Sequence, residues 1–204
     1  MGILMKILFA TTNQAKILKY KEALEKQGIE LLTIKDLDFK LEIDENGKDA
    51  LENAYIKAKA YFDATKIPTI GMDNTLFIEE LPEEQQPGTY VRRVNGKELT
   101  DDEMIEYYTN LVKNNGGQLT AKWVYGMVLY NNGKINKLTW AKDHFYFIDK
   151  PSKIRNNGYP LDSISIIPEF NKYFVELTPE EKRIISADNE TSEIVNFIKN
   201  AILQ

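Results

Sequence analysis

The chain has no cysteine and only one histidine among its 204 residues. The missing cysteine excludes disulfide bonds, thiolate zinc sites and a cysteine nucleophile. His144 alone forms neither a histidine-rich metal site nor a Ser-His-Asp triad, so we interpret it as a structural residue.

Long apolar runs are missing as well, and we expect no secretion signal. No stretch approaches the length that a membrane-spanning helix needs. Residues 1–6 lack the apolar core and the cleavage site of a signal peptide. We therefore expect a cytoplasmic protein with no membrane partner, and the lack of cysteine is compatible with that reducing compartment.

Basic residues are fewer than acidic ones: the 26 Lys and Arg and the 31 Asp and Glu give a formal net charge of -5. A nucleic acid polymer usually requires a dominant basic face, so we expect no such partner, while small phosphorylated ligands remain compatible. An apolar content of 43% over this length indicates a globular chain, either one large domain or two small lobes.

The two common glycine-rich phosphate motifs, GxxxxGK[ST] and GxGxxG, are absent near the apolar run at 7–9. That run leads instead into Ala-Thr-Thr-Asn-Gln-Ala-Lys at 10–16. A strand that ends there and continues as a helix aims backbone N–H groups and a positive dipole end at a docked anion, and Lys16 adds a charge. Thr and Asn are also favoured helix caps, so the residues alone leave a phosphate site and a plain cap both open.

Apolar spacing predicts an α/β fold in which strands and helices alternate through the first half. The expected strands cover 6–10, 29–34 and a segment starting at 68–71, and the expected helices cover 15–26, 49–64, 100–113 and 191–203. Alternation from Thr120 to Tyr130, a turn at 131–134 and a return through 135–148 predict a long β-hairpin. Pro, Gly and Asn mark loops at 81–88 and 151–160.

Three carboxylates have the chemistry to serve a divalent cation: Glu45, Glu52 and Asp73. Asp73 follows an apolar strand, and the carboxyl ends of strands are where open α/β sheets build their sites. Mg²⁺ held by one or two carboxylates, together with one or two lysines, is the expected way to bind a phosphate chain. Lys57 lies on the helix led by Glu52 and could point back to the sheet edge, although most helical lysines are merely solvated.

These residues resemble the inosine triphosphate pyrophosphatases, which hydrolyse non-standard purine nucleoside triphosphates. Six blocks match in the right order across nearly the whole chain. They are 10–16, the segment 45–58 from Glu to Ala, Gly-Met-Asp-Asn-Thr-Leu at 71–76, Pro-Gly-Thr-Tyr at 87–90 with Arg92 and Arg93, Gly-Tyr-Pro-Leu-Asp at 158–162, and Glu-Leu-Thr-Pro-Glu-Glu-Lys at 176–182.

The resemblance implies a role for individual residues. Triphosphate contacts fall on Thr11, Thr12, Asn13, Lys16 and Lys57. Glu45 and Asp73 would bind Mg²⁺, with Asp73 and Lys16 the catalytic pair and Asp73 orienting or deprotonating the attacking water. Tyr159 matches the aromatic residue that stacks on the purine, and Asp162 and Lys182 match residues of the base pocket.

Several positions depart from the family pattern. Ser-Ala-Asp at 186–188 stands where the family has Ser-His-Arg, so two donors to the purine 6-oxo group are absent and base discrimination is expected to change. Met72 replaces an acid beside Asp73, and Asn74-Thr75 replaces Ser-Gly in the same turn.

The resemblance implies a single domain over 1–204, with a long central mixed sheet and flanking helices in two lobes around a nucleotide cleft, and it implies a homodimer. The expected enzyme is a Mg²⁺-dependent nucleoside triphosphate pyrophosphohydrolase that releases pyrophosphate from non-standard purine nucleotides such as ITP, XTP or dITP, with altered base recognition. The alternative is a catalytically impaired nucleotide-binding protein of the same fold.

Overall fold

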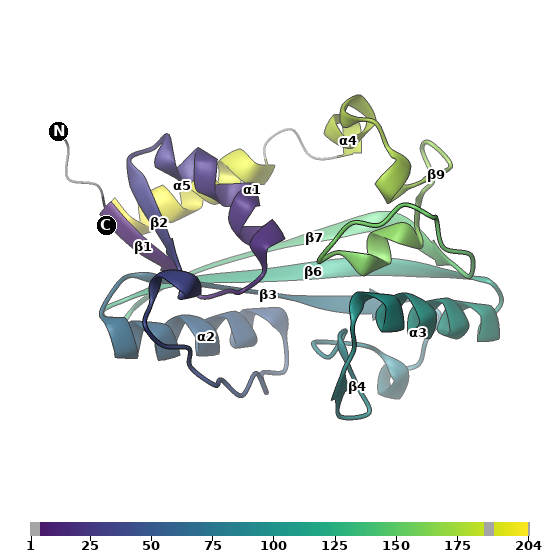
Figure 1. Ribbon diagram of the computed structural model, residues 1–204, viewed down its shortest axis with the longest axis horizontal. Coiled ribbons are helices and arrows are strands. Elements are labelled where there is room, and N and C mark those ends of the chain that lie inside the picture. The colour runs from purple at the N-terminus through teal and green to yellow at the C-terminus, as the bar shows by residue number, and fades with distance from the viewer. Residues whose placement is uncertain (1–4, 186–189, 204) are drawn as a thin grey trace. The chain divides into compact units, whose positions relative to one another are not determined.

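A seven-stranded mixed sheet forms the centre of the computed structural model, which describes residues 5–185 and 190–203. The strand order is β2-β1-β3-β6-β7-β8-β9, with β1 parallel to β2 and β3, and β8 antiparallel to β7 and β9 (Figure 1). Its strands are β1 Met5–Phe9, β2 Ile29–Thr33, β3 Thr69–Ile78, β6 Gln118–Asn131, β7 Lys134–Ile148, β8 Ser165–Ile167 and β9 Lys172–Tyr173. The predicted α/β fold with a long mixed sheet is therefore confirmed.

Five α-helices flank the sheet in the described part of the chain. They are α1 Gln14–Glu25, α2 Ala50–Thr65, α3 Asp101–Asn114, α4 Pro179–Ile185 and α5 Glu190–Leu203. A small separate hairpin pairs β4 Arg93–Val94 with β5 Lys97–Glu98, and short 3-10 turns cover η1 Ile34–Asp36, η2 Glu83–Gln85, η3 Pro160–Ser163 and η4 Phe174–Glu176. Within residues 5–185 and 190–203, no helix has both the length and the apolar character to cross a bilayer.

The chain divides into two compact units with separate cores. Unit 1 comprises 1–74, 125–140 and 188–204, and unit 2 comprises 75–124 and 141–187. The strands β3, β6 and β7 each contribute residues to both units. The single domain over 1–204 and its nucleotide cleft stay predictions.

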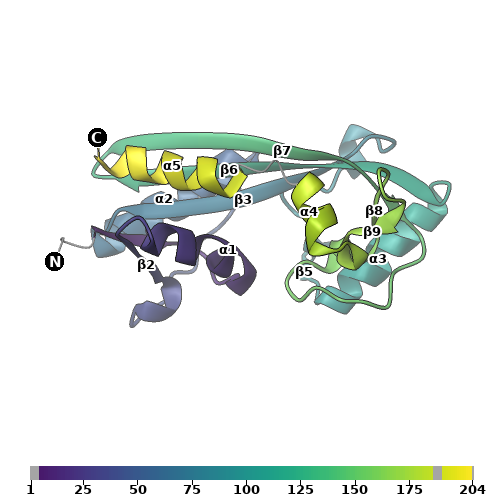
Figure 2. The ribbon, with the colours of Figure 1, turned by 90° about the horizontal axis from the view of Figure 1, so that it is seen from above.

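In unit 1, helices cover both faces of the sheet, which explains why β1 is continuously apolar and buried from Ile7 to Phe9. Alternate residues of a strand point to opposite faces. Accordingly, Ile7 and Phe9 pack in one cluster with α1 and α5, whereas Leu8 packs in another with Tyr61 of α2. The views show α1 and α5 on the side of the sheet opposite to α2 (Figures 1 and 2).

Two glycines let α2 lie directly on the sheet. A Cβ atom on Gly71 of β3 would come within 1.9 Å of the Ala54 carbonyl oxygen, and one on Gly126 of β6 would come within 2.5 Å of the Leu51 backbone nitrogen. These distances are far below van der Waals contact, so only glycine permits this approach. This direct backbone contact of α2 with β3 and β6, called the close seat of α2 below, brings the polar side chains of α2 within reach of β3.

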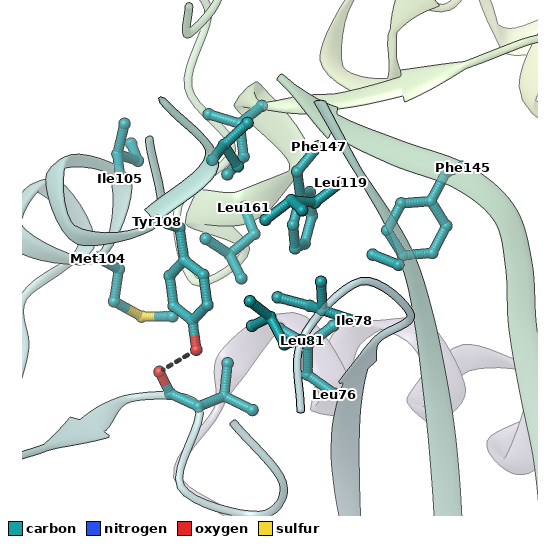
Figure 3. Packing of buried hydrophobic residues seen from close by; sticks show 14 of the residues in the cluster. Leu76, Ile78, Leu81, Met104, Ile105, Tyr108, Leu119, Phe145, Phe147 and Leu161 are labelled. Carbon is teal, nitrogen blue, oxygen red and sulfur yellow. Dashed lines mark hydrogen bonds between the residues drawn. The ribbon is translucent and has the colours of Figure 1, made fainter. Parts of the chain in front are cut away.

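In unit 2, the amphipathic helix α3 supplies one side of the core. A capping box starts it: the Thr100 side chain accepts from the Glu103 backbone N–H, and the Glu103 side chain accepts from the Thr100 backbone N–H. Its buried residues pack on β3, β6, β7 and η3, and the hydroxyl of Tyr108 donates to the Val91 carbonyl at 3.0 Å (Figure 3). The side chains in this cluster include Leu76, Ile78, Met104, Ile105, Tyr108, Leu119, Phe147 and Leu161.

Candidate functional site

The heptapeptide 10–16 forms the junction of β1 and α1, as predicted. The Thr11 hydroxyl accepts from the Asn13 backbone N–H at 3.1 Å, and the Asn13 side-chain oxygen accepts from the Lys16 backbone N–H at 3.3 Å. Asn13 therefore caps α1, with Thr12 exposed next to it. The cap and an anion site are not exclusive, because the first N–H groups of a helix have no partner within the helix.

Lys16 points from the first turn of α1 to β3. Its ammonium group donates to the Asn74 side-chain oxygen at 3.2 Å. Burial and, to a smaller extent, the positive charge of Lys57 lower the pKa of Lys16 to about 8, against an opposing effect of the Asp73 and Glu45 carboxylates. Lys16 is thus a cation whose charge is sensitive to small changes around it.

Lys57 joins the two carboxylates that the resemblance assigns to a metal. Its ammonium nitrogen lies 2.9 Å from Glu45 Oε2 and 3.5 Å from Asp73 Oδ1, and only 13% of its side chain is exposed. The interpretation that Lys57 is a solvated helical lysine is therefore wrong, and the interpretation that it points back to the sheet is confirmed. The close seat of α2 explains this direction.

Asn53, for which the sequence predicts no role, holds Asp73 from the other side. Its amide group donates to Asp73 Oδ2 at 2.9 Å, and its oxygen accepts from the Gly47 backbone N–H at 2.7 Å. The residue is 1% exposed. One amide thereby ties the loop that carries Glu45 to Asp73. A polar residue four positions before Lys57 on the buried face of α2 is the signal that could have found it.

The position of Asp73 corrects the expectation that it follows the end of a strand. β3 continues to Ile78, so Asp73 lies inside it. The neighbouring parallel strand β1 ends at Phe9, which pairs with Ile70. Along β3, Asp73 therefore lies three residues beyond the level at which β1 ends. It still lies at the carboxyl end of a parallel strand, where open α/β sheets build their sites.

Glu52, the third carboxylate considered, serves the start of α2. Its Oε2 accepts from the Lys48 backbone N–H at 2.8 Å, while its own N–H donates to the N-cap residue Asp49 at 2.8 Å. Its side chain is exposed. The contacts give it a capping role.

The donor set of Glu45 and Asp73 fits Mg²⁺ that arrives with a phosphate chain. No group of three or more His, Asp or Glu side chains suited to a metal occurs in residues 5–185 and 190–203. Two carboxylates are nonetheless what Mg²⁺ commonly takes from a protein, since it keeps water and substrate phosphate oxygens as its other ligands. Both carboxylates already face one cationic group, Lys57.

The predicted base-pocket residues lie together in unit 2. Tyr159 precedes η3, and its carbonyl oxygen accepts from the Asp162 backbone N–H at 3.2 Å. Burial raises the pKa of Asp162 to about 6, although a hydrogen bond from Asn156 and the charges of Lys182 and Lys142 oppose this. Lys182 of α4 lies with its ammonium group 5.4 Å from the ring centre of Phe174. This end of unit 2 thus offers an aromatic ring, a carboxyl group and a cation.

Two further sequence interpretations concern other parts of the chain. Residues 186–188, where His and Arg of the family pattern are replaced, lie outside the described residues. His144 on β7 has a side chain that is 82% exposed, with Nε2 3.1 Å from Asp143 Oδ1.

Comparison with known proteins places this chain among pyrophosphatase relatives. The pattern of the Ham1 family matches residues 7–192. The dITP/XTP pyrophosphatase of Aquifex aeolicus is 34% identical over 206 residues, covering 96% of this chain and 98% of that protein. The dITP/XTP pyrophosphatase of Bacillus subtilis is 30% identical over 187 residues, covering 91% and 92%.

Solved structures agree in fold. The HAM1 protein from Coxiella burnetii has a TM-score of 0.74 at 24% identity, with 96% of this chain and 99% of that chain covered. The Ham1 protein of Staphylococcus aureus has a TM-score of 0.71 at 24% identity, with 96% and 98% covered. The seven-stranded architecture described above is thus shared with both.

Proposed function

Because the chain belongs to the Ham1 family and is a hydrolase acting on acid anhydrides, we propose that it is a Mg²⁺-dependent nucleoside triphosphate pyrophosphohydrolase. The reaction cleaves between the α- and β-phosphates and gives a nucleoside monophosphate and pyrophosphate. The proposed substrates are non-standard purine nucleotides such as ITP, XTP and dITP, and the relatives named as dITP/XTP pyrophosphatases support this choice.

The proposed triphosphate site uses the start of α1 and the lysines. Thr11, Thr12 and Asn13 lead into the first turn of α1, where backbone N–H groups and the helix dipole favour an anion. Lys16 and Lys57 supply the charge that holds phosphate oxygens. Phosphate oxygens also give Lys57 a new partner when it leaves a carboxylate.

The proposed catalytic group is Asp73, with Glu45 as the second Mg²⁺ ligand. When bound, Mg²⁺ supplies charge neutralisation at the phosphates and lowers the pKa of a water molecule. Asp73 would orient the attacking water or take its proton, and Asn53 fixes the carboxylate by donating to Oδ2. Lys16 stabilises negative charge that develops on the phosphates.

The proposed base site is in unit 2. Tyr159 stacks on the purine, and Asp162 and Lys182 hydrogen-bond its edge. Ala187 and Asp188 stand where the family pattern has His and Arg, so an acceptor replaces a donor and the 6-oxo preference is proposed to be weaker.

The observation that carries the proposal is the convergence of Glu45 and Asp73 on Lys57, with Asn53 behind Asp73. The test is pyrophosphate release by purified protein with Mg²⁺ from ITP, XTP, dITP and the common nucleoside triphosphates. Asp73→Asn is the control and is expected to abolish release. Release from none of these nucleotides by the wild-type protein would refute the proposal.

A catalytically impaired nucleotide-binding protein is the second candidate, favoured by Met72. This residue, which replaces an acid of the family pattern, is 3% exposed and packs in the core below α1 and α5. Thermal-shift titration distinguishes the candidates, because a bound ligand raises apparent stability by mass action. Nucleotide-dependent stabilisation without pyrophosphate release would favour the second candidate.

We also propose a cytoplasmic homodimer built from one domain over 1–204, with nucleotide as its ligand and no nucleic acid polymer or membrane as partner. Size-exclusion chromatography coupled to light scattering tests the proposed dimer by measuring its mass. A mass near 23.5 kDa, that of one chain, would refute it.

A further inference from the structure

We propose that the ion pair Arg92–Asp101 positions the loop that carries Tyr159, and that it thereby controls base selection without touching the nucleotide. The inference rests on the proposed role of Tyr159 in stacking on the base. All the residues involved belong to unit 2.

The ion pair Arg92–Asp101, called the bracket below, lies on one side of the loop. Arg92 Nη2 lies 2.7 Å from Asp101 Oδ1, and Arg92 Nη1 donates to the Leu99 carbonyl at 2.9 Å. Two bonds from one planar guanidinium fix its orientation better than one bond from a flexible ammonium could. Asp101 is in turn the first residue of α3, a rigid element whose start is locked by the capping box.

The second oxygen of Asp101 holds the loop itself. Asp101 Oδ2 accepts from the Gly158 backbone N–H at 3.0 Å. Gly158 has a φ of +84° and directly precedes Tyr159. A positive φ at this point turns the chain sharply, so the direction in which the Tyr159 side chain leaves the loop depends on where the Gly158 amide is held.

Packing restrains this loop unevenly. Pro160 is buried, whereas residues 153–158 are exposed, and Asn156 and Asn157 lie beside a cavity of about 310 Å³. Exposed side chains next to a cavity have few neighbours to restrain them. The contact of Asp101 with the Gly158 amide therefore helps to hold the loop where packing contributes little.

The charge of Asp101 is stabilised in this bracket. Burial acts to raise the pKa of its carboxyl group, but the hydrogen bonds from Gly158 and Arg92 and the Arg92 charge outweigh it, and the pKa is lowered. The carboxylate is consequently ionised at neutral pH, and it makes charge-assisted bonds on both sides.

Asn156 anchors the loop from the other end. Its carbonyl accepts from the Tyr159 backbone N–H at 2.9 Å, and its side-chain amide donates to Asp162 Oδ2 at 2.8 Å. Tyr159 and Asp162 are thereby coupled to each other through Asn156, and to α3 through Asp101. A shift of the bracket would move both base-site residues together, and small displacements of a binding group are costly.

The test compares Asp101→Asn and Arg92→Ala with the matched control Asp102→Asn. Asp102 is exposed and follows in the same first turn of α3, so its replacement removes the same charge from the helix start without removing the Gly158 contact. Steady-state kcat and KM are measured for every nucleotide that the wild-type protein hydrolyses, and melting temperatures are recorded alongside.

We expect Asp101→Asn and Arg92→Ala to raise KM for the preferred nucleotide about fivefold, the effect of one lost hydrogen bond, with kcat changed less. The ratio of kcat/KM between preferred and poor nucleotides should fall by a similar factor, because poor nucleotides depend less on Tyr159. Arg92→Lys should restore part of the ratio. Asp102→Asn should leave the ratio unchanged.

The double variant Arg92→Ala with Asp101→Asn should be no worse than the more affected single variant, since both remove one link. The inference is overturned if the ratio in Asp101→Asn equals that in Asp102→Asn, or if all nucleotides lose kcat equally. A wild-type protein that hydrolyses no nucleotide would instead refute the proposed function, so the two failures are distinguishable.

Discussion

Single side chains in unit 1 act by holding two groups at once. Lys57 contacts Glu45 and Asp73, and Asn53 contacts Asp73 and the Gly47 amide. Such residues link segments that are distant in sequence, so replacing one of them affects the position of several. Their effects are therefore expected in both stability and activity.

Asn53→Ala is predicted to lower the free energy of unfolding by about 1 to 3 kcal/mol, because it leaves the buried Gly47 N–H without its acceptor. It should also reduce kcat, since Asp73 loses the donor that fixes its carboxylate. Chemical denaturation and pyrophosphate release measure the two effects. Asn46→Ala is the stability control, because Asn46 is exposed and its side chain donates to Asp44, two residues earlier in the same exposed segment. An equal loss of stability in both variants would contradict the role of Asn53.

A second residue prediction concerns Lys16 and pH. The pKa of Lys16 is lowered from 10.5 to about 8 by burial and by Lys57, so the free protein loses this charge near pH 8 rather than near pH 10. If the ammonium form binds the triphosphate, kcat/KM should fall as pH rises through about 8.

The matched variants are Lys16→Arg and Lys26→Arg. A guanidinium keeps its charge throughout this range, so Lys16→Arg should remove the alkaline fall, whereas the exposed Lys26 should make no difference. A pH profile that is the same in Lys16→Arg and wild type would show that another group titrates. The effect of Lys16 on stability runs the other way from its effect on activity. Because the unfolded chain binds the proton of Lys16 more tightly than the folded protein does, the free energy of unfolding should rise between about pH 8 and 10.5.

Among the elements, α2 determines the geometry of the site. Its seat on Gly71 and Gly126 brings Asn53 and Lys57 to the strand that carries Asp73. The spacing is thus set by two backbones in contact.

Gly71→Ala is predicted to lower the free energy of unfolding by about 3 kcal/mol or more, because its Cβ would overlap the Ala54 carbonyl and neither backbone can yield without moving an element. Thermal or urea unfolding measures this. The control Gly133→Ala has open space and a φ of +86°, so it should cost only about 1 to 2 kcal/mol of backbone strain. A smaller loss at Gly71 than at Gly133 would refute the close seat.

Element order could be predicted well from the sequence. Apolar spacing placed α2 at 49–64, against Ala50–Thr65 in the structure, and placed the turn of the long hairpin at 131–134. The end of β3 could not be predicted, because Asp73 and Asn74 are polar and unusual in a strand. Pairing within the sheet outweighs that local preference.

The site could be predicted only in part for a related reason. Lys16, Glu45, Lys57 and Asp73 lie in blocks that resemble a family, and the Ham1 match confirms that resemblance. The contacts of Asn53, Asn74 and Arg92 could not be predicted, because each of these residues bonds to a partner that only the fold brings close. Their contacts are set by the approach of α2, by the start of α1 and by a loop in unit 2.

For the molecule as a whole, the fold is predicted not to depend on the metal. Each of the carboxylates Glu45 and Asp73 already faces the Lys57 ammonium group, so neither is expected to require a metal cation for the protein to fold. A chelator should therefore abolish pyrophosphate release but change the melting temperature of the nucleotide-free protein by less than about 2 °C. Fluorimetry with EDTA and with Mg²⁺ measures this. A large fall in melting temperature with EDTA would contradict it.

The Lys57 ammonium group occupies the position between the two carboxylates that a divalent cation would take. A divalent cation that enters alone must displace this ammonium group and leave it nearby without a carboxylate partner, which like-charge repulsion opposes. A cation that enters with a triphosphate brings an anion to receive the displaced lysine. Exchange is therefore favoured when metal and nucleotide enter together.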